Sequence, residues 1–454
     1  MDFGFLKVCT PKEIEGIREG RKAAITQEAS QTVKKILAGI REKGEDAIVK
    51  YVTRFDGYHP ESFAKIKISE QEIESAASFV ENKYPKLLRS IEACIENLDF
   101  YHQEELKRAC RTWFAQPKKG KKIGQLVNPV KRAGVYAPGG RYPYPSSLIM
   151  AAVPAKIAGV REIAACSPMK RDSDAGKVFL YVCKRLGIHE VYNLGGAQAI
   201  GLFAYGTKSF RKVDKIVGPG NIYVTAAKKE VFGMVGIDSL AGPSEIIVIS
   251  DETGDKDFIA ADLISQAEHD PEAFIMLLTT SSQLAQGVID SIKEQMQSLD
   301  KKYKENARVA YTALKNNCLI ATGKSISELA SISDSSAPEH LEIICRDPQE
   351  LLKLIQNAGA VFVGGYTPVA LGDYIGGTNH VIPTSGNARF SSPLGVNDFL
   401  KRSSVLFYDK EVLSQEKEHV ERFSDFENLH AHKRSIQIRF GEEDENKKMD
   451  NGPA

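Results

Sequence analysis

Apolar residues in the N-terminal hundred positions recur every three or four residues. In segments 29–51 and 70–105 charged residues fill the positions between them. This spacing is typical of helices that bury one face and expose the other. The sequence therefore predicts a helical N-terminal region.

The pattern changes near Lys131, where short apolar runs begin to alternate with helical segments. The first series contains AGVYAPGG, SSLIMAAVPAKIAG, EIAACSP, GKVFLYVCKRLG, EVYNLGG, AQAIGLFAYG, KIVGPGN and a helix from about Ile222. The second contains EIIVIS, a helix over 257–269, FIMLLTT, a helix over 281–299, CLIAT, LEIIC and AVFVGGY. A strand, a turn and a helix repeated at this interval indicate parallel sheets with covering helices. We therefore expect an α/β fold with two Rossmann-like parallel-sheet domains.

Both ends of the chain differ from this central pattern. Beyond Phe390 the sequence is again mostly helical, and residues 441–454 are polar and lack a periodic face. We expect small helical extensions at residues 1–30 and 391–440, followed by a disordered tail over 441–454.

Composition narrows the class of protein. The 454 residues are 42% hydrophobic and 26% charged, with a net charge of +1, which is typical of a globular protein and argues against nucleic acid or a membrane as the main partner. The N-terminus does not resemble a secretory signal, and no apolar run approaches the roughly 18 residues of a spanning helix, so we expect the cytoplasm. The seven cysteines are dispersed without a CxxC pair, which argues against a disulfide framework and a thiolate zinc site.

Glycine-rich turns follow three of the predicted strands, at residues 136–140, 195–198 and 218–221. Glycine lets backbone amides approach a ligand, and a helix N-terminus favours an anionic phosphate. None of the turns spells GxGxxG, and a single glycine turn is more often structural. A nucleotide site and a set of structural turns both remain open on this pattern.

A polar stripe marks the helix predicted within FIAADLISQAEHDPEAF. Asp262, Gln266 and His269 are spaced i, i+4 and i+7 and share one face. The Asp270-Pro271 pair ends the helix directly after the histidine. The stripe is either a solvated face or part of a metal site.

Further ligand types occur elsewhere in the chain. Asp373 precedes His380 by seven residues, and His430 and His432 form a His-Ala-His sequence. Two histidines, one carboxylate and one amide oxygen would suit zinc, although cobalt or manganese could occupy the same set.

Glu339 and His340 stand between a proline and a predicted strand, in SSAPEHLEI. Adjacent side chains of an extended segment point apart, so the two could serve different proton transfers in one cleft. The alternative is an exposed pair at the start of a strand.

These residues lie in long motifs: EKGEDAIVKYVTRFDG, GVYAPGGRYPYPSS, LGGAQAIGLFAYGT, KIVGPGNIYVTAAKKEV, AGPSEIIVISD, LISQAEHDPEA, SAPEHLEI, NAGAVFVGGYTPVALGDYIGGTNHVIPTSGNARFSSPLGVNDFLKR and ENLHAHKRSIQIR. Together and in this order they closely resemble the histidinol dehydrogenase family. The resemblance extends from about residue 30 to about residue 440, nearly the whole chain.

The resemblance implies a role for each matched residue. One Zn²⁺ per subunit would be held by Gln266, His269, Asp373 and His432, with His430 outside the ligand set. Glu339 and His340 match the catalytic pair. The substrate would be bound by the four zinc ligands and His340 together with Ser244, His380 and Glu427, and NAD⁺ would be contacted by Tyr136, Gln198 and Asn221.

The resemblance also implies an intertwined homodimer whose C-terminal segment completes the partner's active site. Glu427 and His432 would then act in trans. The implied domains are residues 31–135 with 244–390, carrying the metal and catalytic groups, and residues 136–243, binding NAD⁺; residues 391–440 form the arm.

The implied activity is the NAD-dependent oxidation of L-histidinol through L-histidinal to L-histidine, the last step of histidine biosynthesis. An alternative function is that of relatives that oxidise other polyols, such as sulfonated propanediols. Glu427 argues against this alternative because it favours a cationic substrate. The 140–143 loop, Gly-Arg-Tyr-Pro, varies from the family pattern and leaves its effect on the cofactor open. A zinc hydrolase would require a motif such as HExxH, which is absent, and a non-catalytic paralogue should have lost a matched residue.

Overall fold

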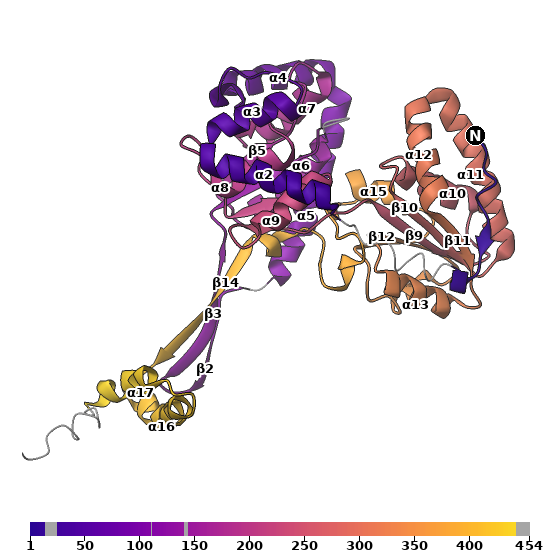
Figure 1. The fold of residues 1–454 in the computed structure, drawn as a ribbon. Helices are drawn as coiled ribbons and strands as arrows, with labels where there is room; N and C mark the ends of the chain where they lie inside the picture. Colours follow the sequence, from indigo (N-terminus) through magenta and orange to yellow (C-terminus); the bar gives the residue numbers. More distant parts are fainter. Residues whose placement is uncertain (14–24, 110, 140–143, 442–454) are drawn as a thin grey trace, which may run out of the picture. The chain divides into compact units, whose positions relative to one another are not determined.

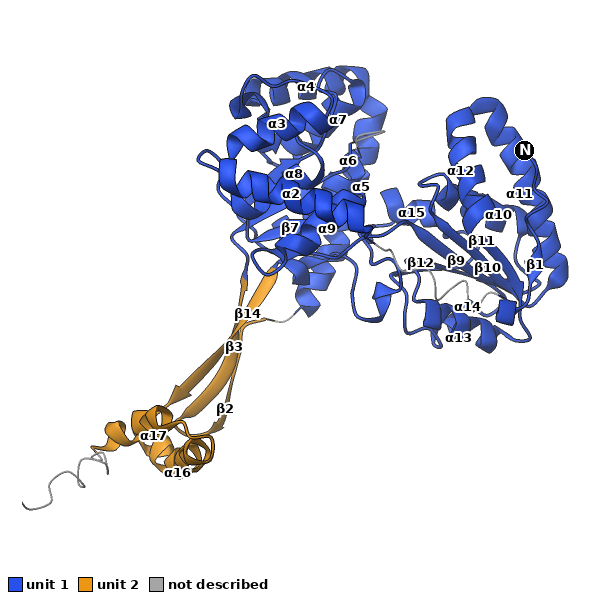
Figure 2. Cartoon of the chain, in the orientation of Figure 1, with its two compact units in different colours: residues 1–109, 129–399 blue, residues 110–128, 400–454 orange. Residues whose placement is uncertain are grey.

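The computed structural model describes residues 1–13, 25–109, 111–139 and 144–441 (Figure 1). The loop at 140–143 and the tail from residue 442 onward, for which the sequence raised specific expectations, lie outside the described residues. The chain forms two compact units (Figure 2). Unit 1 contains residues 1–109 and 129–399, and unit 2 contains residues 110–128 and 400–454.

The first sheet of unit 1 is built from the first predicted series. Its strands are all parallel and run in the order β6-β5-β4-β7-β8. They are β4 (Arg132–Tyr136), β5 (Glu162–Cys166), β6 (Glu190–Tyr192), β7 (Lys215–Val217) and β8 (Gly236–Ile237), with helices α6 (Pro145–Ile157), α7 (Asp174–Arg185), α8 (Gly196–Tyr205) and α9 (Ile222–Val231). This arrangement confirms the predicted parallel sheet.

Four helices precede this sheet: α2 (Gln27–Lys43), α3 (Glu45–Phe55), α4 (Glu70–Lys83) and α5 (Pro85–Arg108). Gly44, with φ of +55°, separates α2 from α3, and Pro85 begins α5. Ile40 and Val52 share one apolar core with Phe203 of α8. This packing groups α2 and α3 with the first sheet, whereas the predicted boundaries joined residues 31–135 to residues 244–390.

The second sheet of unit 1 has six parallel strands in the order β1-β11-β10-β9-β12-β13. They are β1 (Val8–Cys9), β9 (Glu245–Ser250), β10 (Phe274–Thr279), β11 (Cys318–Thr322), β12 (His340–Ile344) and β13 (Ala360–Val363). The predicted helical extension at residues 1–30 therefore includes a strand, because Val8 and Cys9 add to the open edge beside β11.

Helices cover both faces of the second sheet (Figure 1). On one face lie α10 (Lys256–Ala267), α11 (Ser282–Lys302), α12 (Lys304–Asn317) and α15 (Val369–Tyr374), and on the other lie α13 (Ile326–Ser336) and α14 (Pro348–Leu352). The inner strands β9 and β10 are apolar except at their ends, because both of their faces are buried. Short 3₁₀ turns occur at η1 (Phe63–Lys65), η2 (Asn387–Arg389) and η3 (Val396–Phe399).

Unit 2 combines a three-stranded sheet with a helical end. The strands are β2 (Trp113–Lys118), β3 (Lys121–Pro129) and β14 (Leu400–Tyr408), and the helices are α16 (Lys410–Phe426), α17 (His430–Gln437) and η4 (Ile438–Phe440). Lys118 and Lys121 form ion pairs of 2.8 and 3.2 Å with Glu416 of α16. The sequence predicted α16 and α17 but not the strand β14.

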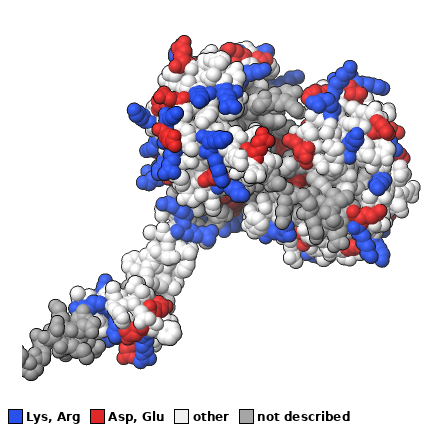
Figure 3. Space-filling model, in the orientation of Figure 1, with Lys and Arg blue, Asp and Glu red and all other residues white. Residues whose placement is uncertain are grey.

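Acidic and basic side chains are interspersed over the face shown in Figure 3, as the net charge of +1 leads one to expect. Among the described helices, none is both long and apolar enough to cross a membrane. The six cysteines in the described ranges are free thiols.

Candidate active site

His340 begins β12 and is held in one tautomer. Its Nδ1 lies 2.8 Å from the backbone carbonyl oxygen of Glu245. Because a carbonyl oxygen can only accept, Nδ1 carries the proton and Nε2 keeps its lone pair. Burial lowers the pKa of His340, against an opposing effect of the Asp373 carboxylate. The structure therefore presents a neutral imidazole with Nε2 able to accept a proton.

Glu339 lies beside this imidazole at the start of the same strand. Its Oε2 accepts a hydrogen bond of 2.8 Å from the backbone N–H of Glu245. Burial raises the pKa of Glu339 well above its usual value, and the carboxylates of Glu245 and Asp373 raise it further. Both Glu339 and His340 are buried, which excludes the alternative of a solvent-exposed pair.

His380 lies in the loop after α15 and contacts a helix that covers the first sheet. Its Nδ1 donates to the backbone carbonyl oxygen of Asp373 at 3.0 Å. Nε2 is therefore the acceptor, and the Ser147 hydroxyl of α6 donates to it at 3.3 Å. This contact brings a predicted substrate residue against α6 within unit 1. Ser147 was not predicted as a site residue. The signal for it was its place in the motif GVYAPGGRYPYPSS, at the start of a helix that follows a glycine turn.

The predicted metal ligands of unit 1 come from α10 and α15. Gln266 lies in the last turn of α10, His269 follows the helix end, and Asp373 lies on α15. His269 and Asp373 both influence the pKa of His340 and of His380, with His269 lowering it and Asp373 raising it. His269 and Asp373 therefore lie near both His340 and His380.

These three side chains have the chemistry of a zinc site. Gln266 is 2% exposed, and its amide forms no hydrogen bond with another described residue. The His269 imidazole and the Asp373 carboxylate likewise form no hydrogen bond or ion pair within the described ranges. Among the described residues no group of three or more His, Cys, Asp or Glu side chains is arranged to hold a metal ion. An amide oxygen, an imidazole and a carboxylate fit three of the four positions that zinc uses.

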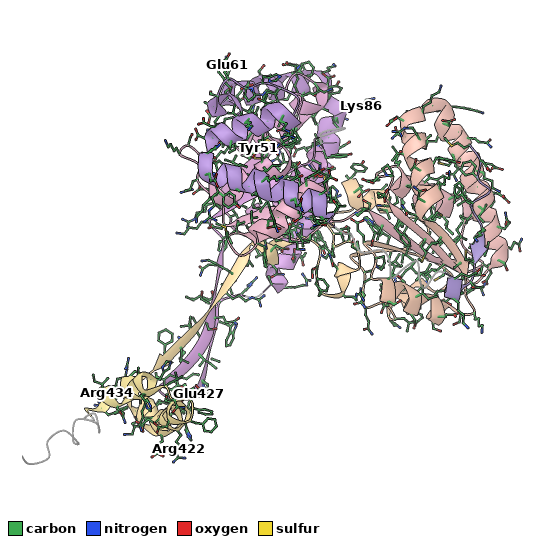
Figure 4. All side chains as sticks on the ribbon, viewed as in Figure 1. Tyr51, Glu61, Lys86, Arg422, Glu427 and Arg434 are labelled. Carbon is green, nitrogen blue, oxygen red and sulfur yellow. The ribbon has the colours of Figure 1, made fainter. Side chains whose placement is uncertain are left out.

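Glu427 and His432 belong to unit 2. Glu427 directly follows α16 and is labelled in Figure 4, and His432 lies in the first turn of α17, two residues after His430. All three side chains are exposed. Their participation in the site of unit 1 remains a prediction.

Ser244 precedes β9, next to Glu245, and its backbone carbonyl oxygen accepts from the N–H of Phe274 at 2.8 Å. Its side chain is partly exposed. Ser244 thus lies at the same end of the sheet as His340, because β9 and β12 are parallel neighbours.

The three glycine turns lie at the carboxyl edge of the first sheet, after β4, β6 and β7, of which β4 and β7 are neighbours. The Tyr136 hydroxyl accepts a hydrogen bond of 3.3 Å from the N–H of Gly196. Gly218 has φ of +117°, and a side chain there would place its Cβ 1.9 Å from the carbonyl oxygen of Tyr136. Asn221 caps α9, accepting from the N–H groups of Tyr223 and Val224. This edge is where open parallel sheets bind ligands.

Asp56, at the end of α3, holds the second glycine turn. Its carboxylate accepts from the N–H of Gly195 at 3.1 Å and from the Gln198 amide at 3.1 and 3.2 Å. Burial raises the pKa of Asp56, and these two hydrogen bonds oppose that rise. Gln198 is 1% exposed, and its amide nitrogen is engaged by Asp56. Asp56 was not predicted as a site residue, although Asp56 lies in the motif ending VTRFDG.

Two parallel sheets, one bordered by glycine-rich turns and the other by a buried glutamate–histidine pair, indicate an α/β enzyme. The histidinol dehydrogenase family model matches residues 19–440. A histidinol dehydrogenase of Bacillus thuringiensis subsp. konkukian is 42% identical over 440 residues, covering 97% of this chain and 98% of that protein. One from Clostridium acetobutylicum is 44% identical over 423 residues, covering 93% and 94%.

A solved structure agrees with these sequence matches. The crystal structure of histidinol dehydrogenase from Elizabethkingia anophelis superposes with a TM-score of 0.86 at 29% identity, covering 97% of this chain and 99% of that one. The chain belongs to the histidinol dehydrogenase family, a family of oxidoreductases. This confirms the predicted family and α/β fold class.

Proposed function

We propose that this protein is an NAD-dependent L-histidinol dehydrogenase that oxidises L-histidinol through L-histidinal to L-histidine, in the cytoplasm. The observation that carries the proposal is the hydrogen bond from His340 Nδ1 to the Glu245 carbonyl oxygen, which leaves Nε2 to accept a proton. Family membership over nearly the full chain supports the substrate.

His340 is the base in both oxidations. Its Nε2 accepts the hydroxyl proton of the alcohol, and later that of the aldehyde hydrate, as the carbon loses a hydride. The hydrogen bond from Nδ1 to Glu245 keeps the ring oriented and stabilises the imidazolium that forms. Tyr136, Gln198 and Asn221 would hold NAD⁺, which when bound would supply the hydride acceptor for each oxidation.

Glu339 activates the water that hydrates the aldehyde. Its Oε2 lies 3.5 Å from His340 Nδ1, the ring nitrogen that does not accept the substrate proton, so Glu339 can act on water while Nε2 of His340 acts on the substrate hydroxyl. A carboxyl with a raised pKa can take up and release a proton closer to neutral pH than an exposed one. Retaining the aldehyde in the site keeps a reactive intermediate out of solution.

Gln266, His269, Asp373 and His432 of the partner subunit would hold one zinc ion per subunit. Bound zinc supplies a Lewis acid that anchors the amino alcohol. Ser244, His380 and the partner subunit's Glu427 orient the substrate, and the glutamate charge favours a cationic, imidazole-bearing molecule over a sulfonate.

An apolar surface on unit 2 supports the homodimer. Phe423 and Phe426 of α16 are 70% and 88% exposed, and Leu406 of β14 is 67% exposed. Large apolar side chains gathered on a small unit indicate a surface that a partner covers. Glu427 follows Phe426 directly, so a second copy that covers this surface would bring Glu427 and His432 to its own site.

A panel of substrates tests this assignment. We expect L-histidinol to give the highest kcat/KM, a sulfonated propanediol to be oxidised poorly, and simple esters and amides to remain uncleaved. Preferred oxidation of the sulfonate would move the function to a sister dehydrogenase, and NAD-independent ester cleavage would identify a hydrolase.

A further inference from the structure

Two carboxyl groups meet in the apolar core of the second sheet. Glu342 is the third residue of β12 and is 1% exposed, between Val248 and Phe362 on the adjoining strands. Asp262 of α10 lies against it. Within the described residues no Lys, Arg or His forms an ion pair with either group, and the proposed function assigns neither of them a role.

The two oxygens of Glu342 have different partners. Oε1 accepts a hydrogen bond of 2.9 Å from the backbone N–H of Val369. Oε2 is fully buried and accepts no hydrogen bond in the described part of the chain. Burial raises the pKa of Glu342 well above its usual value, and that of Asp262 to about 6. Burial thus favours a protonated Glu342, whose hydroxyl would donate to the neighbouring Asp262 carboxylate.

This arrangement connects three elements that carry proposed site residues. Side chains alternate along a strand, so Glu342 and His340 share the face of β12 that α10 and α15 cover. Asp262 lies one turn before Gln266 on α10, and Val369 is the first residue of α15, which carries Asp373.

The helix α15 depends on this contact. It has six residues, and no side chain within its own N-terminus caps it. A helix this short is not stable alone, and its first N–H groups need acceptors from outside. Glu342 supplies one of these acceptors. An apolar residue at this position would fill the core without the free-energy cost of burying acids, but it could not accept this hydrogen bond.

The geometry points to Glu342 as a positioning residue that, hydrogen-bonded to Asp262 and to the Val369 N–H, sets the spacing of α10 and α15 and so aligns Gln266 and Asp373 as metal ligands. This inference rests on the zinc site of the proposed function. It assigns Glu342 no contact with substrate or metal.

The test measures zinc affinity of the full-length protein by competition with a chromogenic chelator, without any turnover. Glu342→Leu removes both hydrogen bonds and should weaken zinc binding roughly 10- to 100-fold, the usual effect of losing a group that orients a ligand. Glu342→Gln keeps both, because its amide oxygen can accept from Val369 and its amide nitrogen can donate to Asp262. It should bind zinc as the wild type does.

Two further variants separate alignment from loss of stability. Ser250→Ala removes a buried hydrogen bond of 2.6 Å to the Ile344 carbonyl at the other end of the same strand pair, and should lower Tm without changing zinc affinity. Val369→Pro removes the N–H that donates to Glu342, at a helix position that tolerates proline, and also replaces a buried core side chain; it should weaken zinc binding by more than its loss of Tm, compared with Ser250→Ala, accounts for.

A folded Glu342→Leu protein with wild-type zinc affinity would overturn the inference, as would Glu342→Gln binding as weakly as Glu342→Leu. A wild-type protein that binds no zinc would overturn the proposed metal site together with it. If the wild type binds zinc and Glu342→Leu binds it equally well, the positioning role alone is refuted.

Discussion

The imidazole of His340 donates through Nδ1 to the backbone carbonyl oxygen of Glu245, at 2.8 Å across the parallel strands β12 and β9. A backbone acceptor cannot be protonated or removed by substitution. The orientation and tautomer of the base are therefore set by the sheet itself, and the lone pair of Nε2 is available before substrate binds.

Replacing the base should impair both oxidations. His340→Asn keeps a donor toward the Glu245 carbonyl but offers no basic nitrogen, so kcat should fall roughly 10²- to 10⁴-fold with histidinol and with histidinal. Steady-state rates with each substrate check this. Normal turnover of either substrate would contradict the role of His340.

Glu339 should matter most for hydration of the aldehyde. Glu339→Gln can still accept from the Glu245 N–H through its amide oxygen, but it cannot take a proton from water. We expect oxidation of supplied histidinal to fall more than the first oxidation of histidinol, measured as single-turnover NADH formation. Equal losses in the two steps would argue against water activation by Glu339.

The aldehyde step should not need a cysteine. Cys345 is the cysteine nearest to the catalytic pair in sequence, but five residues of extended strand separate it from His340 by roughly 16 Å. Burial also raises the pKa of the Cys345 thiol, which disfavours the reactive thiolate. Cys345→Ser should keep most activity, whereas a large fall in kcat in a folded protein would favour a thiohemiacetal route.

Asp56 should act on cofactor binding. Asp56→Ala loses the hydrogen bonds to Gly195 and Gln198, worth about 1 kcal/mol each, so the KM for NAD⁺ should rise roughly tenfold or more with little change in kcat. Asp56→Asn can still accept the hydrogen bond from Gly195, so its KM for NAD⁺ should lie between those of the wild type and Asp56→Ala. A fall in kcat with an unchanged KM would contradict a role in holding the nucleotide turn.

Stability should depend on pH through Asp262. Its pKa is raised from 3.8 to about 6 in the folded protein, so between these values the native state binds more protons than the unfolded state. The contribution of Asp262 to the free energy of unfolding is therefore full below pH 4 and falls as the pH rises toward 6.

Asp262→Asn should flatten that part of the profile. Urea unfolding of both proteins between pH 4 and pH 7 measures it. Parallel profiles for the wild type and Asp262→Asn would mean that Asp262 does not titrate in this window.

The sheets could be predicted from the sequence because their strands are short and apolar on both faces. Residues 245–250 and 274–279 form β9 and β10 as expected. The position of the three glycine turns at one edge follows from the parallel sheet itself, because all of its strands end there.

Contacts between distant segments could not be predicted in this way. Asp56 reaches Gln198 across 142 positions, and Ser147 reaches His380 across 233. The sequence of an amphipathic helix reveals its apolar face but not which sheet that face packs against. The pattern alone therefore could not assign α2 and α3 to the first sheet. His340 and Ser244 lie at the amino edge of the second sheet, whereas the general rule directs attention to carboxyl edges.

The stoichiometry of the reaction tests the central claim most directly. Purified protein is mixed with L-histidinol and excess NAD⁺, and the NADH and histidine formed are counted per histidinol consumed, with and without a chelator. The account predicts two NADH per histidine, loss of activity on chelation and recovery with zinc. No NADH from histidinol, or release of histidinal after a single NADH, would contradict it.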